Sequence, residues 1–213
     1  MPVSCARDEI LARVRAGACQ QKPAIGGVDR EALNPQPVLP AGLIERFQDK
    51  ALAQACTVVR VATSALAPAA VRQFLDEIGA SPVAVVTPEL SNLNWADAGV
   101  AVAARAAVDA DQVGISGVYC AIAETGTLML LSGPSTPATV SLLPETHVAL
   151  LEAERIVPTM EAAFTLLQAE HGQLPRAVNF VSGPSRTGDI EQTIVLGAHG
   201  PCRVHVILIG EAS

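Results

Sequence analysis

Glu124 is the only charged side chain between Gln112 and Pro144. A carboxylate that leaves an apolar strand and enters a Thr125-Gly126 turn is either desolvated and suited to proton transfer, or kept ionised by nearby hydrogen-bond donors. Glu124 is therefore a candidate catalytic acid–base residue, and Thr125 and Gly126 are candidate substrate-binding positions beside it. A structural role, in which Glu124 organises the turn through backbone hydrogen bonds, remains an equal alternative.

A second candidate site follows a Ser-Gly-Pro-Ser segment that occurs twice, at 132–135 and at 182–185. The later copy continues into Arg186, and a guanidinium among hydroxyls and exposed backbone N–H groups can bind a carboxylate or phosphate through two hydrogen bonds. The alternative is that Arg186 pairs internally with Asp189 or Glu191. The predicted substrate-binding residues here are Ser182, Ser185, Arg186, Thr187 and Asp189. Asp189 and Gln192 have capping-box spacing, which predicts a helix starting near Asp189.

His147 is the histidine best placed for acid–base chemistry, because it begins a strand that follows the charge-poor stretch. His199 lies in a Gly-rich turn, where a structural role is favoured, and neither His171 nor His205 has a neighbourhood typical of catalysis. The histidine spacing predicts no metal site. The five cysteines have no CxxC spacing, so no zinc ribbon or cluster-binding segment is expected. Nucleotide-binding glycine loops and the serine-hydrolase elbow are also missing from the sequence.

Composition limits the class of partner. The net charge is −7 and aromatic residues are 3%, which argues against a nucleic-acid surface. The uncharged stretch from Thr125 to Pro144 contains several Gly and Pro residues, so no membrane span is expected. Nothing near the N-terminus reads as an export signal, and the odd cysteine count favours reduced thiols, so we expect a cytoplasmic protein.

The apolar pattern predicts the elements that position these residues. A first helix carries Ile10, Leu11, Val14 and Ala18 on one side. A Pro- and Gly-rich linker follows, which makes 1–42 an N-terminal helical arm and 43–213 the main domain. A helix near 43–52 opens that domain. Beyond it, helices are expected at 67–78 and 160–170, and strands at 57–61, 83–86, 113–115, 121–123, 127–131, 147–151, 177–181 and 203–209. This alternation predicts an α/β fold with a mixed sheet flanked by helices.

Four motifs in this order resemble the LUD-domain family, most closely its lactate utilization protein C branch. They are Ala123-Glu124-Thr125-Gly126-Thr127, Ser141-Leu142-Leu143-Pro144 ahead of His147, the 182–191 segment, and Gly197-Ala198-His199-Gly200-Pro201. Gly188 departs from the pattern, since relatives often have Ala there. The resemblance covers the chain from about Cys56 to the end, more weakly the part before it. It implies a NagB/RpiA/CoA-transferase-like sheet and a role beside two iron–sulfur subunits that oxidise L-lactate to pyruvate.

Three functional hypotheses follow. In the first, this chain binds a small 2-hydroxy or 2-oxo carboxylate, binds no cofactor alone, and passes electrons to iron–sulfur clusters on its partners. In the second, it is a stand-alone enzyme acting on a CoA thioester or a sugar phosphate, with Glu124 as nucleophile or base. In the third, it is a non-catalytic assembly or sensing subunit. The Ala-rich segment 100–107 would then contact a partner, although a buried helix explains this segment equally well.

Overall fold

The computed structural model describes residues 6–18, 42–188, 194–196 and 200–210. Its internal contacts divide the chain into two units, Met1–Gln36 and Pro37–Ser213. Within the first unit, helix α1 (Ala6–Ala18) forms where the apolar spacing predicts it. The domain boundary at 42/43 stays a prediction, and the second unit carries the rest of the described elements.

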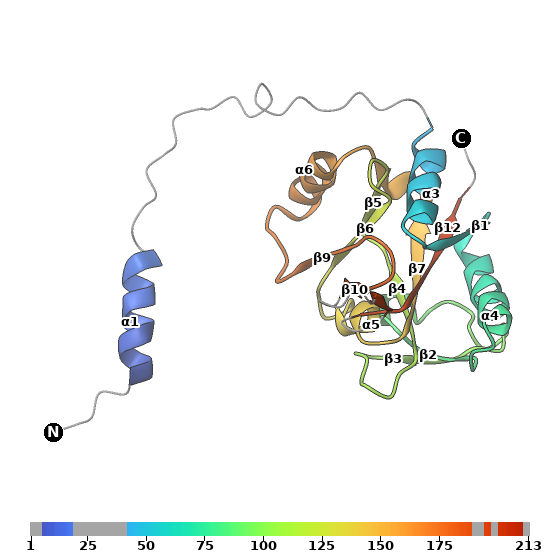
Figure 1. Cartoon of the computed structure of the whole chain (residues 1–213), viewed down its shortest axis with the longest axis horizontal. Helices are drawn as coiled ribbons and strands as arrows, with labels where there is room; N and C mark the ends of the chain where they lie inside the picture. Colours follow the sequence, from blue (N-terminus) through green and yellow to red (C-terminus); the bar gives the residue numbers. More distant parts are fainter. Residues whose placement is uncertain (1–5, 19–41, 189–193, 197–199, 211–213) are drawn as a thin grey trace. The chain divides into compact units, whose positions relative to one another are not determined.

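The larger sheet of the second unit is parallel throughout, with strand order β1-β12-β7-β4-β2-β3. Its strands are β1 (Thr57–Val61), β2 (Val83–Val86), β3 (Ala101–Ala104), β4 (Val113–Gly117), β7 (Thr146–Glu152) and β12 (Arg203–Ile209), coloured from cyan to red in Figure 1. The central strands are buried almost throughout, as at residues 113–116 of β4 and 146–151 of β7, because both faces of a parallel sheet are covered.

A smaller sheet continues two strands of the larger one. It has the order β8-β5-β6-β9, with β5 (Cys120–Ile122), β6 (Thr127–Leu131), β8 (Ile156–Val157) and β9 (Val178–Val181). β5 follows β4, and β8 follows β7 after one 3₁₀ turn (Ala153–Arg155), so the parallel pairing of β4 with β7 continues as that of β5 with β8. The smaller sheet is mixed, because β6 pairs antiparallel with β5 and β9.

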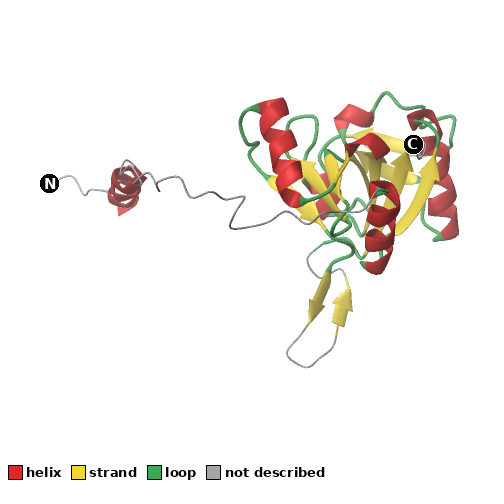
Figure 2. Ribbon diagram, turned by 90° about the horizontal axis from the view of Figure 1, so that it is seen from above, coloured by secondary structure: helices red, strands yellow, loops and turns green. Residues whose placement is uncertain are grey.

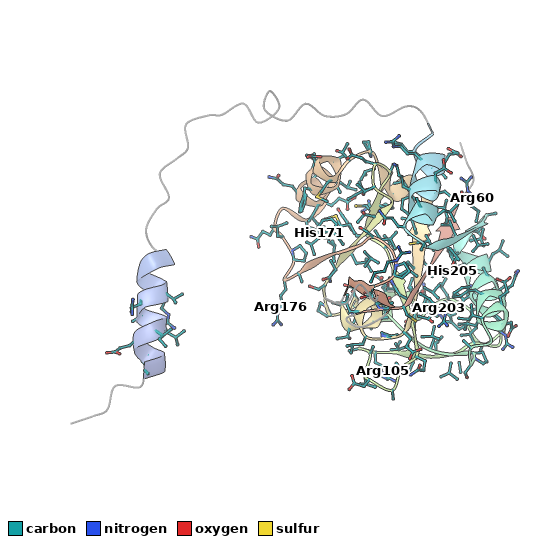
Figure 3. All side chains as sticks on the ribbon, in the orientation of Figure 1. Arg60, Arg105, His171, Arg176, Arg203 and His205 are labelled. Carbon is teal, nitrogen blue, oxygen red and sulfur yellow. The ribbon has the colours of Figure 1, made fainter. Side chains whose placement is uncertain are left out.

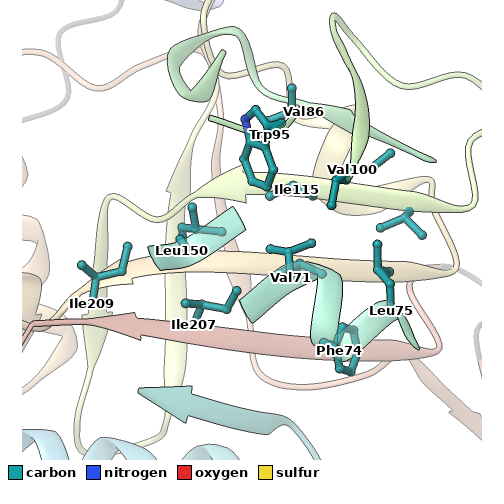
Figure 4. Close-up of a cluster of buried hydrophobic side chains, with 14 residues drawn as sticks. Val71, Phe74, Leu75, Val86, Trp95, Val100, Ile115, Leu150, Ile207 and Ile209 are labelled. Carbon is teal, nitrogen blue, oxygen red and sulfur yellow. The ribbon is translucent and has the colours of Figure 1, made fainter. Parts of the chain in front are cut away.

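Helices cover the sheets on three sides. Helix α4 (Ala67–Glu77) packs Val71, Phe74 and Leu75 against one face of the larger sheet, where Ile115, Leu150 and Ile207 complete the core shown in Figure 4. Helix α3 (Leu43–Ala53) buries Phe47 and Ala51 on the other face, between the two sheets. Helix α6 (Met160–His171) covers the outer face of the smaller sheet. A single turn, α5 (Thr139–Leu142), lies over β4 and β7.

The α/β class with helices flanking the sheet is confirmed, and one local expectation needs revision. The segment 100–107 contains the edge strand β3 rather than a buried helix, because its alanines pair with β2. The helix expected to start at Asp189 falls outside the described residues, but on either side of it the chain forms an antiparallel hairpin, β10 (Arg186–Gly188) and β11 (Ile194–Leu196), seen in Figure 2. Among the described residues, no helix combines the length and apolarity needed to cross a membrane.

Two glycines allow the backbone of the second unit to approach helix α3 closely. Gly126 has φ +71°, and a β-carbon there would lie 2.5 Å from the backbone nitrogen of Ala51. Gly183 has φ +93°, and a β-carbon there would collide with the carbonyl oxygen of Gln54. Both positions need glycine for their positive φ and for the missing side chain. The C-terminal end of α3 therefore fixes both turns that carry predicted site residues.

We predict that Gly126→Ala lowers the free energy of unfolding by about 2–4 kcal/mol, because strain at positive φ adds to a collision with helix backbone. Gly172→Ala is the matched control: Gly172 has φ +66°, but its β-carbon would meet nothing within 4 Å. That variant should lose only about 1 kcal/mol. Urea unfolding of both variants measures the difference, and equal losses would contradict the close approach to α3.

Candidate functional site

The first candidate site is a chain of hydroxyl groups that links two loops far apart in the sequence. Thr125 Oγ1 donates to Thr127 Oγ1 at 2.8 Å, and Thr127 Oγ1 shares a 2.7 Å hydrogen bond with Ser182 Oγ. The register explains the contact, since Leu128 pairs with Val181 and the next residues outward are Thr127 and Ser182. When Thr127 donates to Ser182, the exposed Ser182 hydroxyl keeps its own hydrogen for a ligand.

Glu124 and Arg186, two charged residues of the predicted site, lie on either side of this hydroxyl chain in sequence. Glu124 is half-buried at the β5–β6 turn, and its backbone N–H donates to Pro158 O at 3.1 Å. Arg186 is exposed at the start of β10. Within the described part of the chain, Arg186 forms no ion pair with any carboxylate, and Glu124 and Arg186 form none with each other.

The remaining residues of this site are only partly described. The backbone N–H of Ser185 donates to Pro201 O at 2.8 Å, which ties the segment to the chain leading into β12. Thr187 pairs with Val195 across the β10–β11 hairpin. Asp189 and Glu191 lie outside the described residues, so the alternative of an internal pair with Arg186 stays open. The structure thus brings the Thr125–Thr127 turn and Ser182 into direct contact. Arg186 follows four residues after Ser182 in the same segment.

His147 is not part of this site. It lies in β7 with no exposed surface, and its Nε2 shares a 2.9 Å hydrogen bond with Ser116 Oγ on the neighbouring strand β4. Its Nδ1 is buried without a partner among the described residues, and burial lowers its pKa to about 4. The imidazole is therefore neutral at pH 7. The predicted catalytic role of His147 stays a prediction, and it would have to act through Ser116.

Ser116 leads to a second candidate site, a cavity of about 470 Å³ at the carboxyl ends of β2, β4 and β7. In open α/β sheets this edge is where ligands collect. Three buried hydroxyls line the cavity: Thr87 follows β2, Ser116 lies in β4, and Ser141 lies in α5. The earlier Ser-Gly-Pro-Ser copy contributes Ser135 to the wall, while its Ser132 Oγ accepts from Ala177 N at 2.8 Å.

The charges around this cavity are mainly acidic. Glu89, Glu152 and Glu154 line it, together with one arginine, Arg155. Two guanidinium nitrogens of Arg155 bond to the two carboxylate oxygens of Glu170, at 2.6 and 2.9 Å, and hold the pKa of Glu170 down to about 2. The Arg155 charge is thus neutralised within the protein.

Tyr119 closes the same side of the cavity. Its hydroxyl donates to Glu170 Oε2 at 2.8 Å, and its ring lies 5.6 Å from that of His171, which Figure 3 labels near helix α6. The Arg155 guanidinium lies 4.7 Å from the centre of the Tyr119 ring. Desolvation and the Glu170 carboxylate raise the pKa of the Tyr119 hydroxyl to about 12, so this hydroxyl stays protonated as a hydrogen-bond donor.

Sequence reasoning missed the cavity residues Thr87, Glu89 and Ser116. Gly-, Ser- and Thr-rich segments mark the predicted sites, whereas Glu89 lies outside such a segment, three residues beyond a predicted strand that ends in Val86. Treating the carboxyl end of every predicted parallel strand as a site candidate would have found all three. For metal ions, the described residues contain no group of three or more His, Cys, Asp or Glu side chains arranged to hold one.

The sequence is similar to proteins that contain a LUD domain. The model of the LUD domain matches residues 44–209. A lactate utilization protein C from Geobacillus sp. (strain WCH70) is 42% identical over 100 residues, which cover 46% of this chain and 42% of that protein. The lactate utilization protein C of Bacillus subtilis (strain 168) is 36% identical over 102 residues, with the same two coverages. Each alignment thus spans less than half of the curated relative.

A solved structure supports the fold. The crystal structure of a DUF162 family protein from Deinococcus radiodurans superposes with a TM-score of 0.59 and covers 82% of this chain and 100% of its own. The two sequences are 21% identical, so the likeness concerns the arrangement of helices and strands. It agrees with the parallel sheet flanked by helices that holds both candidate sites.

We predict that stability falls as the pH drops from 7 to 4, because two buried histidines resist protonation. His205 stacks on Phe74 of α4 with ring centres 3.8 Å apart (Figure 3 labels His205), and burial lowers its pKa to about 4, as for His147. Both histidines protonate near pH 6.5 once unfolded. Between that pH and about 4 the unfolded chain binds more protons, so each histidine costs up to about 1.4 kcal/mol per pH unit.

Urea unfolding at a series of pH values measures this slope. His205→Phe keeps an aromatic ring against Phe74 and removes one titrating group, so its slope should be smaller by about one proton. An unchanged slope in this variant would show that His205 is not buried in its neutral form.

Proposed function

Because the chain belongs to the LUD domain family, we propose that it is a cytoplasmic subunit of a system that oxidises L-lactate to pyruvate. Relatives named lactate utilization protein C support involvement in lactate utilization. The proposal assigns electron transfer to two iron–sulfur partner subunits, because the five cysteines of this chain have no cluster-binding spacing. The aligned part covers less than half of each relative, so activity and partners are both part of the proposal.

The contact between Thr127 and Ser182 is the observation that supports ligand binding by this chain. It places the Thr125-Gly126 turn beside the loop that leads to Arg186. In the proposed site the Arg186 guanidinium binds the carboxylate of a 2-hydroxy or 2-oxo acid, and Ser182 and Ser185 supply further hydrogen bonds. Thr187 and Asp189 complete the set of residues that we propose to bind the ligand.

The proposed chemistry needs a proton acceptor. Lactate loses two electrons and two protons when it becomes pyruvate. In the proposal Glu124 accepts the hydroxyl proton, the second proton goes to solvent, and the electrons pass to the partner clusters. Glu124 suits this role because it lies next to Thr125, at the start of the hydroxyl chain that ends in Ser182.

The strand-end cavity gives no support to the CoA-thioester and sugar-phosphate alternative. Such substrates carry phosphate groups, and the cavity at the strand ends is lined by Glu89, Glu152 and Glu154. Its single arginine is already paired with Glu170. A phosphate would meet net negative charge there, which opposes binding.

Removal of the Arg186 charge tests the ligand site. We predict that Arg186→Ala weakens binding of lactate or pyruvate at least tenfold, because a charge-assisted hydrogen-bond pair is lost. Isothermal titration calorimetry measures the affinity. Arg176→Ala is the matched control, since Arg176 is also exposed and precedes β9 (Figure 3). Unchanged affinity in Arg186→Ala would remove this residue from the site.

The role of Glu124 is tested in the reconstituted system. Glu124→Gln keeps the shape of the side chain and removes its ability to accept a proton, so lactate-dependent reduction of an acceptor should fall at least a hundredfold. Lactate affinity should change little, because the carboxylate contacts remain. Full activity of the variant would instead favour the non-catalytic assembly or sensing subunit.

A further inference from the structure

The cavity at the carboxyl ends of β2, β4 and β7 has no role in the lactate proposal. Its floor is built from the buried hydroxyls of Thr87, Ser116 and Ser141, each 2% exposed. These hydroxyls are held in place: Ser116 bonds to the fully buried His147, and Ser141 donates to Ala138 O at 3.0 Å. A floor of this kind offers a ligand fixed hydrogen-bonding groups in a preformed space.

Glu89 is a partly exposed carboxylate that accepts a hydrogen bond from one hydroxyl of this floor, that of Thr87. A β-carbon at position 117 would collide with Glu89 Oε1, so Gly117 allows the carboxylate to lie directly on the β4 backbone. Its donors are neutral: the Gly117 backbone and the Thr87 hydroxyl, which donates at 3.4 Å. Desolvation raises the pKa of Glu89. In the described part of the chain, no Lys, Arg or His forms an ion pair with it.

Two further carboxylates, Glu152 and Glu154, add negative charge to the lining of the cavity. Glu152 ends β7, and desolvation and the neighbouring Glu154 raise its pKa. Arg155 cannot offset these carboxylates, because Glu170 binds it through both oxygens and Tyr119 O accepts from its Nε at 2.8 Å. Besides the paired Arg155, the one other basic side chain in the described lining is His171, beside Tyr119, so three carboxylates outnumber the bases and the cavity is acidic.

The volume and the apolar walls of the cavity indicate which kind of cation could neutralise these carboxylates. No group of three or more potential ligands among the described residues is arranged for a metal ion. The volume of about 470 Å³ is that of an organic-ligand pocket, and Val118, Leu130 and Pro137 provide apolar wall for a carbon skeleton. We infer that this cavity binds a small organic cation, whose ammonium or guanidinium group pairs with Glu89.

Three probes of equal length test the charge requirement. Putrescine carries two ammonium groups, butanediol of the same chain length carries two hydroxyls, and succinate carries two carboxylates. We expect putrescine to bind and to shift the amide resonances of Gly117 and Val118, butanediol to bind at least tenfold more weakly, and succinate not to bind. Agmatine tests whether a guanidinium is preferred to an ammonium. Equal affinity for putrescine and butanediol would overturn the inference.

Two variants test the assignment to Glu89. Glu89→Gln should weaken putrescine binding at least tenfold, while Glu77→Gln, which removes the same charge from α4 outside the cavity, should leave it unchanged. An unchanged affinity in Glu89→Gln would overturn the inference. If Glu89→Gln does not fold, the salt dependence in the unmodified protein decides: binding through an ion pair weakens as salt rises, and insensitivity to salt would contradict the inference. Neither measurement involves lactate, so failure here leaves the lactate proposal untouched.

Discussion

Strand β7 is the element on which both candidate sites depend. It pairs on both edges, with β12 and with β4, so its register fixes the height of His147 against Ser116 and of Glu152 against the cavity rim. Its continuation into β8 then pairs with β5, whose turn carries Glu124. A slip of one residue in this strand would turn His147 towards α4 and move both sites together.

Helix α3 supplies the second constraint. Its last turn lies against Gly126 from one loop and Gly183 from another, and the contact excludes a side chain at either position. Because both loops are fixed by the same helix end, the hydrogen bond between Thr127 and Ser182 costs little further ordering. The hydroxyl chain is therefore a rigid part of the core edge, whereas Arg186 reaches outward from the β10–β11 hairpin.

The sequence predicted most elements because their apolar runs match the period of buried strands, and β1, β2, β6 and β12 form at the expected residues. Edge strand β3 was missed because alanine-rich segments favour helix equally well. The cavity could not be derived from composition, since Thr87, Ser116 and Ser141 come from three distant segments. Only the strand order brings them together, and that order depends on non-local pairing.

The low content of charged residues makes the separation of charge between the two sites effective. Arg186 and the carboxylates of Glu89, Glu152 and Glu154 are exposed, so each acts mainly on a ligand bound directly beside it, because water and salt screen it at longer range. Arg186 lies at the strand exit, the 182–186 segment that follows β9, whereas the cavity at the carboxyl ends of β2, β4 and β7 carries three carboxylates and an arginine already paired with Glu170. A carboxylate ligand placed in the cavity would face Glu89, and an organic cation placed at the strand exit would face Arg186. In the proposed arrangement the two sites therefore select ligands of opposite charge, and neither ligand competes for the other's place.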